Sequence, residues 1–335
     1  MLSFAIRRVL LVIPVMIGLT MLVFTIFRLL PGDPVGLAAG PHATREEIAR
    51  LAREFGYDQP FWVQYWVYVT GLLRGDWGMS LFTRRPVVED LRAYLPATLE
   101  LVVAAMLFAV VVGVPAGLLA ARFRDRWPDT LSRVFALGAI SMPRFFLGLL
   151  LQLYFAMWLG LLPLGGRYPI IEEPPPFVTG FLTIDAMVAG DMTALSLALQ
   201  HLAMPAIAMS LSPLATIMRM MRASTLEVLQ QDYVTTERAL GLSERLILFK
   251  YVLKNAFSAT LTVIGLYFGW LLGGTVLVET VFDWPGIGLY ATKSILSQDM
   301  VPIMGVTLVI GLIFVSVNLL VDLCYGLLNP KVRTE

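Results

Sequence analysis

The chain has 335 residues, of which 58% are hydrophobic and only 15% are charged, and its formal net charge is +1. Its mean hydropathy of +0.76 is far above what a soluble domain of this length needs to build a core, so the bilayer is the expected solvent. The composition therefore excludes a soluble globular protein and favours a chain that crosses a membrane several times.

Six stretches are long and apolar enough to cross a bilayer as helices, which takes about 20 mostly apolar residues each. They are residues 9–30, 95–121, 131–162, 194–221, 256–281 and 302–328. The sequence thus predicts an all-α polytopic membrane protein with six transmembrane helices. The first run is longer than the apolar core of a signal peptide, about 7 to 15 residues, so we interpret residues 1–30 as the N-terminus and a retained first span.

Basic residues indicate the orientation, since segments rich in Lys and Arg near the membrane tend to stay in the cytoplasm. With the N-terminus inside, the cytoplasmic side holds Arg7, Arg8, Arg122, Arg124, Arg126, Arg133, Arg219, Arg222, Arg238, Arg245, Lys250, Lys254, Lys331 and Arg333. The short segments on the opposite side contain only Arg167 and Lys293. We therefore expect both termini, including the tail 331–335, in the cytoplasm.

Residues 31–96, after the first span, are expected to form a helical insertion outside the membrane. Thr44 and Glu47 have the spacing of a capping box and precede a short helical pattern. Residues 61–68, "FWVQYWVY", follow with four closely spaced Trp and Tyr side chains. That composition is typical of a helix at the level of the lipid headgroups or of one packed against a neighbouring span.

The sequence contains no clear catalytic or metal-binding pattern. The sequence has no Gly-Lys-Ser/Thr phosphate loop, so we expect the chain itself not to hold ATP. The two histidines, His42 and His201, are far apart and have no cysteine partner, which argues against a metal site. An intramembrane hydrolase using Ser210, Ser212 and His201 would lack a base placed beside a nucleophile. We expect a non-catalytic chain without a cofactor or metal of its own.

One long polar passage, residues 231–255, separates two apolar spans and predicts a helix, a turn and a second helix. Residues 232–240 can form a short helix that ends at Gly241, and Ser243 can cap the next one, which would run to about Asn255. The second helix would turn one side toward the protein, formed by Leu246, Phe249, Val252 and Leu253.

The size and charge of this passage favour a docking role. With four basic and three acidic residues, its net charge is only +1, and the flanking spans confine it to the membrane surface, which argues against DNA binding. A plain connection between two spans would need only about two to eight residues. A short helix projecting from a membrane domain is suited to a groove on a partner protein.

Residues 222–256 also carry a recognisable pattern, with Gly241 four residues after the end of the triplet Thr235-Thr236-Glu237. The pattern resembles the cytoplasmic loop of ABC importer permeases of the dipeptide and oligopeptide branch, whose triplet is EAA-like. The sequence departs from the general pattern at the triplet and at Lys254, where proline is common. Six further stretches resemble the B-type subunit of these importers in the same order: "LLPGDP", "GLLRGDWGMS", "ISMPRFFLGLLL", "LGLLPLGG", "ETVFDWPGIG" and "NLLVDLCYGLLNPKVR".

The resemblance implies a type I ABC importer permease fold, in which residues 97–330 form a five-helix core that contains the coupling loop 222–256. It implies a bacterial inner-membrane importer of dipeptides or short oligopeptides. The partners would be a homologous C-type permease, two cytoplasmic ABC ATPases that bind ATP and Mg, and an extracytoplasmic substrate-binding protein. Nickel complexes, glutathione and sugars remain open as solutes. A secondary carrier is a further alternative, but it would not need a cytoplasmic docking helix.

The resemblance places the residues that couple the permease to the ATPases on the first helix of the loop and its turn. They are Asp232, Tyr233, Val234, Thr235, Thr236, Glu237, Arg238, Ala239, Leu240, Gly241 and Leu242. We expect the face that meets the ATPase to consist of Tyr233, Val234, Glu237 and Leu240.

Two charged residues inside predicted spans are candidates for the translocation path. Arg144 lies about 13 residues into the third span, or about 20 Å along a helix, where facing lipid would cost several kcal/mol. It could contact a peptide carboxylate, pair with an acid such as Glu100, or lie nearer the interface than the span suggests. Glu279, near the outer end of the fifth span, could line an outer gate or reach water at the interface.

Overall fold

Helices account for most of the chain in the computed structural model, which describes residues 2–29, 44–54 and 58–328. Its long helices are α1 (Leu2–Leu29), α5 (Val87–Arg122), α9 (Met192–Val228), α12 (Leu253–Val281) and α14 (Met300–Leu328). Its shorter helices are α3 (Arg45–Glu54), α4 (Phe61–Arg74), α6 (Trp127–Ser141), α7 (Arg144–Leu151), α8 (Leu182–Ala189), α10 (Asp232–Ala239), α11 (Glu244–Leu246) and α13 (Ile287–Leu296), with π-helical turns η1 (Gln152–Trp158) and η2 (Ile247–Val252). The predicted all-α architecture is confirmed for these residues.

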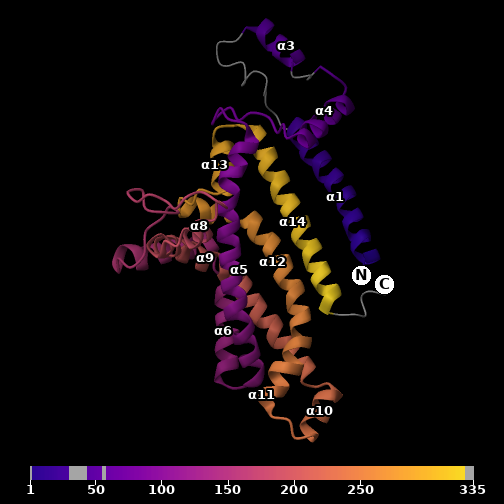
Figure 1. The fold of residues 1–335 in the computed structure, drawn as a ribbon, viewed down its shortest axis with the longest axis vertical. Helices are drawn as coiled ribbons and strands as arrows, with labels where there is room; N and C mark the ends of the chain where they lie inside the picture. The colour runs from indigo at the N-terminus through magenta and orange to yellow at the C-terminus, as the bar shows by residue number, and fades with distance from the viewer. Residues whose placement is uncertain (1, 30–43, 55–57, 329–335) are drawn as a thin grey trace.

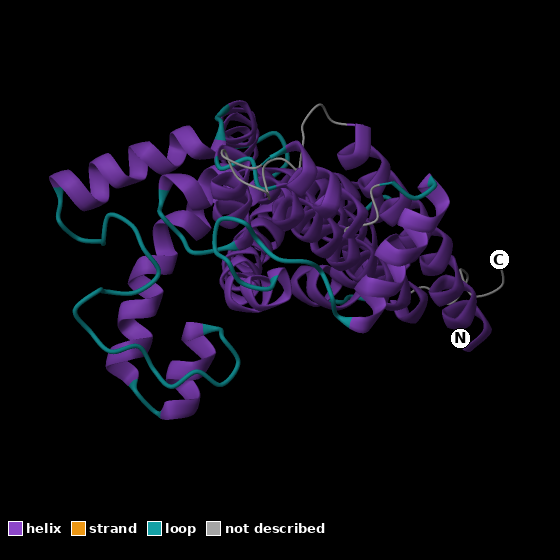
Figure 2. Cartoon of the chain, turned by 90° about the horizontal axis from the view of Figure 1, so that it is seen from above, coloured by secondary structure: helices purple, strands orange, loops and turns teal. Residues whose placement is uncertain are grey.

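The long helices form a bundle, with the short helices at its two ends. Helices α3, α4 and α13 lie at one end, and α10 and α11 lie at the other (Figure 1). Seen from above, loops and short helices extend away from the bundle on one side, the side on which α8 lies (Figure 2). Five helices in the described residues are long and apolar enough to cross a membrane, and one bent pair would make a sixth.

The bent pair corrects the prediction of a continuous third span over residues 131–162. Helices α6 and α7 meet at an angle of 101°. Met142, between them, has an extended backbone, because the ring of the following Pro143 disfavours a helical conformation for the residue before it. Pro143 also has no N–H to donate to the preceding turn, so the helix stops and restarts at Arg144.

The centre of the bundle is the contact between α5 and α9, which small residues bring close together. Ala105, Ala109, Gly113 and Gly117 recur every four residues along α5, so they lie on one face of the helix. A Cβ atom at Gly117 would lie 2.5 Å from the carbonyl oxygen of Met218 on α9. Only a residue without a side chain permits this approach, a common way to pack helices where lipid gives no hydrophobic driving force.

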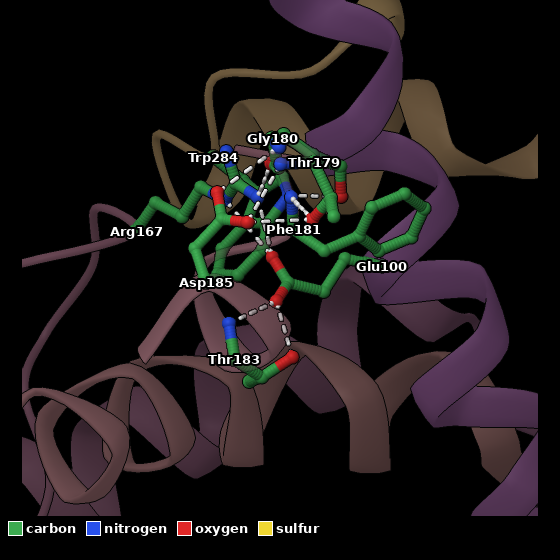
Figure 3. Close-up of polar contacts among 9 residues, drawn as sticks. Glu100, Arg167, Thr179, Gly180, Phe181, Thr183, Asp185 and Trp284 are labelled. Atoms are coloured by element: carbon green, nitrogen blue, oxygen red, sulfur yellow. Dashed lines mark hydrogen bonds and ion pairs between the residues drawn. The ribbon is translucent and has the colours of Figure 1, made fainter. Parts of the chain in front are cut away.

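At the α13 end of the bundle, Glu100 of α5 holds the loop that leads from η1 to α8 (Figure 3). One carboxylate oxygen of Glu100 accepts hydrogen bonds from Arg167 Nε at 3.0 Å and Nη2 at 2.5 Å. The other accepts from the Thr183 backbone N at 2.8 Å and its hydroxyl at 2.7 Å. A pair between Glu100 and Arg144, which the sequence left open, is therefore wrong, because the carboxylate of Glu100 is already fully engaged.

A second carboxylate, Asp185 of α8, fixes the same loop from its other side. It accepts hydrogen bonds from the Thr179 backbone N and hydroxyl, each at 2.7 Å, and from the Gly180 backbone N at 3.0 Å. Burial raises the pKa of Asp185, but these hydrogen bonds outweigh the effect and hold that pKa below its ordinary value. The loop is thus held by two carboxylates and has a defined path.

The helical insertion after α1 has the local structure that the sequence predicts. The Thr44 backbone N donates to the Glu47 carboxylate at 2.8 Å, and the Glu47 backbone N donates to the Thr44 hydroxyl at 3.3 Å, so the capping box is confirmed. Helix α4 packs on α1 through aromatic rings, with Phe24 lying 5.6 Å from Tyr65 between ring centroids. Trp62 on α4 stays exposed, so one side of this aromatic helix contacts the neighbouring span and the other does not.

Replacing Arg167 with Met should destabilise the protein strongly. Glu100 is 4% exposed, and removing the cation leaves a buried carboxylate without its charge partner, which typically costs about 3–5 kcal/mol. Thermal unfolding in detergent, followed by circular dichroism, measures the effect. Lys293→Met is the matched control, since Lys293 is an exposed cation at the same end of the bundle. Equal melting temperatures for the two variants would contradict the assignment.

Candidate coupling loop and intramembrane cleft

Helix α10 projects from the end of the bundle opposite α13 and ends at Ala239, followed by a turn at Gly241 (Figure 1). Gly241 has a φ of 80°, the left-handed region that glycine adopts without strain. The backbone N of Leu242 donates to the Glu237 carbonyl at 3.2 Å, and that of Gly241 donates to the Arg238 carbonyl at 3.0 Å. These two bonds form a Schellman motif, so the turn has a defined geometry.

Val234 anchors the inner side of α10, contrary to its predicted place on the partner-facing side. It is completely buried, in a cluster with Met221, Ile247 and Val252. On a helix of only eight residues, burying this side chain holds the helix against the bundle. Two polar contacts add to the anchor: Asn255 donates to the Tyr233 hydroxyl at 2.8 Å, and Arg238 pairs with Glu244 at 2.7 Å.

Of the other three predicted residues, Tyr233 and Leu240 lie on the exposed side of α10, and Glu237 does not. Leu240 is 74% exposed and Tyr233 is 37% exposed. Glu237 is half-buried, and one of its carboxylate oxygens is shielded from solvent without a hydrogen-bond partner within the described residues. The exposed side of α10 therefore presents a leucine and a tyrosine, whereas the carboxylate of Glu237 is partly shielded from solvent.

The second helix of the loop differs from the prediction in its length and in its buried side. The Ser243 hydroxyl caps it as expected, accepting from the Leu246 backbone N at 3.4 Å. The helix does not end near Asn255, however, but continues from Glu244 to Val281 over 38 residues. The turn of the loop is therefore joined to the predicted fifth span by one uninterrupted helix.

The π-helical turn η2 explains why the second helix of the loop buries a different side from the one predicted. Of the four residues expected to face the protein, Val252 is completely buried and Leu253 is half-buried, as expected. Leu246 and Phe249 are exposed, and Ile247 is completely buried instead. In a π-helix, residues five apart lie on the same face, so the pattern expected for an α-helix shifts by a residue.

The chain leading into the loop is held by a buried ion pair. Arg222, near the end of α9, donates through Nε and Nη2 to the two carboxylate oxygens of Asp129 on α6, at 2.5 Å and 2.8 Å. Asp129 is fully buried and also lies 3.6 Å from Arg133. This bidentate pair is a strong and directional contact, so α6 and α9 are fixed to each other where α9 approaches the loop.

A cleft of about 660 Å³ opens between α7, α12 and α14. The residues that line it are Pro143, Arg144, Phe145, Gly269, Trp270, Gly273, Gly274, Leu277, Val278 and Phe314. On α12, Trp270, Gly273, Gly274 and Leu277 have helical spacing and share one face. This spacing is visible in the sequence, but it does not by itself predict a cleft.

Arg144 lies at the start of α7 and extends to α12. A Cβ atom at Gly274 would lie 2.5 Å from its Nη1 atom, so Gly274 leaves room for the guanidinium beside the α12 backbone. Gly274 precedes the end of α12 at Val281 by seven residues, or about 10 Å. The Arg144 guanidinium therefore lies beside the outer part of α12, and not at the depth that a continuous third span would give it. The described residues provide no ion-pair or hydrogen-bond partner for the Arg144 side chain.

Glu279, the second path candidate, is fully buried and does not line this cleft. Thr98 on α5 donates to its carboxylate at 2.6 Å, and the Leu289 backbone N on α13 donates at 2.9 Å. A Cβ atom at Gly288 would lie 2.9 Å from the same carboxylate. The interpretation that Glu279 reaches water at the interface is wrong, because the ends of α5, α12 and α13 enclose it.

The residues of the hydrolase alternative are not assembled into a site. His201 Nδ1 lies 3.0 Å from the Gly165 carbonyl oxygen, and the Ser210 hydroxyl donates to the Ile207 carbonyl at 2.9 Å. The described residues contain no group of three or more His, Cys, Asp or Glu side chains that could hold a metal ion. His42 lies outside the described residues.

Comparison with known families identifies the architecture. A family described as "Binding-protein-dependent transport system inner membrane component" matches residues 113–334, and the N-terminal component of the same systems matches residues 1–102. The chain belongs to this family. Its helices therefore form the membrane component of a binding-protein-dependent transport system, as the resemblance of the loop and six further stretches implies.

Three relatives match over nearly their full length. The dipeptide transport system permease protein DppB of Alkalihalophilus pseudofirmus is 43% identical over 333 residues, which cover 99% of this chain and 100% of the relative. The probable D,D-dipeptide transport system permease protein DdpB of Escherichia coli is 42% identical, covering 95% and 94%. The glutathione transport system permease protein GsiC of Shigella boydii is 37% identical, covering 99% of each.

Replacing Val234 with Asp should detach α10 from the bundle. A charge placed in the cluster beneath the helix costs several kcal/mol, and each ~1.4 kcal/mol corresponds to a factor of ten in the detached population. Limited trypsin digestion at Arg238 measures the detached population, since the rate of cleavage follows the fraction of molecules in which the site is open. We expect the variant to be cleaved at least about tenfold faster than the wild type. The control is Thr235→Asp, at the neighbouring exposed position. Equal cleavage of both variants would contradict the anchoring role.

Proposed function

We propose that this chain is the permease subunit of an ATP-driven importer of dipeptides or short oligopeptides. The observation that carries the proposal is α10, a short helix that projects from one end of the bundle, is anchored by Val234 and ends in a defined turn at Gly241. Such a helix fits a groove on a soluble partner. The names of the relatives DppB and DdpB support a dipeptide as the solute.

The partners in this proposal are a homologous C-type permease, two cytoplasmic ABC ATPases and an extracytoplasmic substrate-binding protein. The ATPases bind ATP and Mg and hydrolyse the nucleotide, so this chain has no catalytic site and no cofactor of its own. The family description, with its reference to a binding protein, supports this assembly. Asp232 to Leu242 form the contact with one ATPase, and Tyr233 and Leu240 lie on its exposed side, whereas Glu237 is half-buried.

The proposed orientation places α10 in the cytoplasm and α3 and α4 outside. The beginning of α1 and the end of α14 lie toward the α10 end of the bundle (Figure 1), and Arg8 of α1 pairs with Asp322 of α14 at 2.9 Å. Both termini are then cytoplasmic, as the distribution of Lys and Arg favours. The membrane is the inner membrane of a bacterium.

The mechanism follows from the connections of α10. ATP binding draws the two ATPases together and displaces the docked helix. Because Gly241 leads into an uninterrupted helix from Glu244 to Val281, the displacement reaches the face of α12 that lines the cleft. Arg144 lines the translocation path in this proposal, and the path changes from inward-facing to outward-facing as α12 moves.

The name of GsiC favours glutathione as a second candidate solute. Uptake measured with radiolabelled dipeptide, and competed with unlabelled glutathione in excess, separates the two candidates in the assembled transporter. A dipeptide importer keeps its uptake under this competition, whereas a glutathione importer shows dipeptide uptake near background.

Substitution of Gly241 by Trp should lower dipeptide uptake at least about tenfold without preventing membrane insertion. The left-handed backbone costs a residue with a Cβ about 1–2 kcal/mol, and the indole would collide with a docked ATPase. Apart from its chain neighbours, a Cβ at Gly241 meets no atom of the described residues within 4 Å, so the fold itself tolerates the change. Uptake and ATPase activity in proteoliposomes of the full transporter measure the effect.

The matched control is Gly241→Asn, since Asn adopts the left-handed region at lower cost and has a small side chain. It should transport nearly as well as the wild type. Charge reversal in Glu237→Lys should lower uptake and ATPase coupling in the same way as Gly241→Trp. Normal uptake in Gly241→Trp with both ATPases still bound would refute the coupling role of the loop.

Uptake should also depend on ATP hydrolysis by the partners. In proteoliposomes that contain this permease with hydrolysis-deficient ATPases, we expect dipeptide uptake to fall to the level of empty vesicles. A secondary carrier would continue to transport under an ion gradient, because its energy comes from the coupled ion. Persistent uptake of this kind, with the substituted ATPases assembled, would exclude the proposed importer.

A further inference from the structure

Arg144 differs from two other half-buried arginines of the described bundle, Arg167 and Arg222. Arg167 is bound by Glu100, and Arg222 is bound by Asp129. Arg144 is partly buried and faces the cleft, and the described parts of the chain offer its guanidinium no ion-pair or hydrogen-bond partner. An arginine within a membrane span is costly unless it faces a partner, a ligand or a water-filled cavity, and the cleft gives a ligand access to this guanidinium.

The position of the guanidinium is set by three local features. Pro143 breaks the helix and places Arg144 in the first position of α7. The side chain then extends to α12, where Gly274 leaves space for Nη1 that a Cβ atom would occupy. Apart from its own turn of helix, no atom of the described residues lies within 4 Å of a Cβ position at the neighbouring Gly273, so the α12 surface beside the guanidinium is open.

The rest of the cleft is apolar. Phe145, Trp270, Leu277 and Phe314 contribute large hydrophobic side chains, and Trp270 is 72% exposed. None of the described residues that line the cleft is an Asp or a Glu. Its volume of about 660 Å³ lies within the usual range of small-molecule sites, about 300–1,000 Å³. One cation in an apolar cleft selects an anionic group attached to a neutral or apolar body.

We propose that Arg144 and the cleft around it form a carboxylate-recognition subsite that determines which peptides pass through the permease. The inference rests on the proposed peptide import and assigns a ligand group to one residue. The planar guanidinium matches a carboxylate in charge and in geometry. Two sources share this chemistry, the C-terminal carboxylate of a peptide and an acidic side chain.

The test uses the complete transporter in proteoliposomes with four peptides: Ala-Ala, Ala-Ala-amide, Ala-Glu and Ala-Gln. Uptake by Arg144→Gln is divided by wild-type uptake of the same peptide at a saturating concentration of loaded binding protein, so that selection by the binding protein cancels. If the subsite takes the C-terminal carboxylate, we expect the ratio for Ala-Ala to fall about tenfold below the ratio for its amide. If it takes an acidic side chain, the ratio for Ala-Glu falls similarly below that for Ala-Gln.

Gly274→Ala is a second variant that keeps the charge. Its methyl group occupies the space of Nη1 and displaces the guanidinium, so it should cause the same selective loss to a smaller degree. Lys293→Gln is the matched control, since it removes a cation outside the cleft, and it should leave all four ratios equal. Should Arg144→Gln fail to assemble, Gly274→Ala decides the question alone.

Equal ratios for all four peptides in Arg144→Gln and in Gly274→Ala would overturn the proposal. A uniform loss would show that Arg144 pairs with an acid of the partner permease, and unchanged uptake would show that no substrate touches it. Failure of the proposed function is a separate result, because the wild-type transporter would then take up none of the peptides when ATP is supplied.

Discussion

The hydrocarbon interior of a membrane offers no partner to a buried charge, and this constraint explains how the bundle is held together. Glu100 with Arg167 at one end and Asp129 with Arg222 at the other join segments that are 67 and 93 residues apart in sequence. Each pair directs several hydrogen bonds to one carboxylate, the geometry that compensates for removing two charges from water. Between them, the small residues of α5 let α9 approach closely without polar contacts.

Because ion pairs hold both ends of the bundle, the parts that can move most easily are those attached by weaker contacts. Helix α10 is attached through one buried valine, an exposed ion pair and a hydrogen bond between Asn255 and Tyr233. Exposed ion pairs contribute little, up to about 1 kcal/mol. In the proposed coupling, the loop therefore shifts as a unit while the Asp129–Arg222 pair stays closed. Because α11, η2 and α12 are continuous, such a shift is transmitted along the helix rather than absorbed at a joint.

Local signals in the sequence predicted local structure well. The capping box at Thr44, the helix end at Gly241 and the cap at Ser243 each depend on residues within a few positions, and each is present. The burial of Val234 and the π-turn at Ile247 depend on packing against α5 and α9, so an α-helical pattern could not reveal them. The sequence shows Pro143 within the third predicted span. Whether a proline kinks a span or breaks it, however, depends on the tertiary contacts on each side. The coupling role of Asp232 to Leu242 and the path role of Arg144 and Glu279 remain predictions, because both roles depend on partner chains.

The break at Pro143 connects the fold to the chemistry of the cleft. In a continuous helix, Arg144 would lie on one face of a span and extend along it. The 101° bend instead makes Arg144 the first residue of a helix that runs toward α12. Its guanidinium lies beside Gly274, which has no side chain to exclude it. A proline, an arginine and a glycine from two separate segments thus place one cation at the wall of an apolar cleft. Since α12 also continues to the coupling loop, the proposed docking helix and the proposed carboxylate subsite are joined by one helix, through which a movement of α10 would change the distance between Gly274 and Arg144.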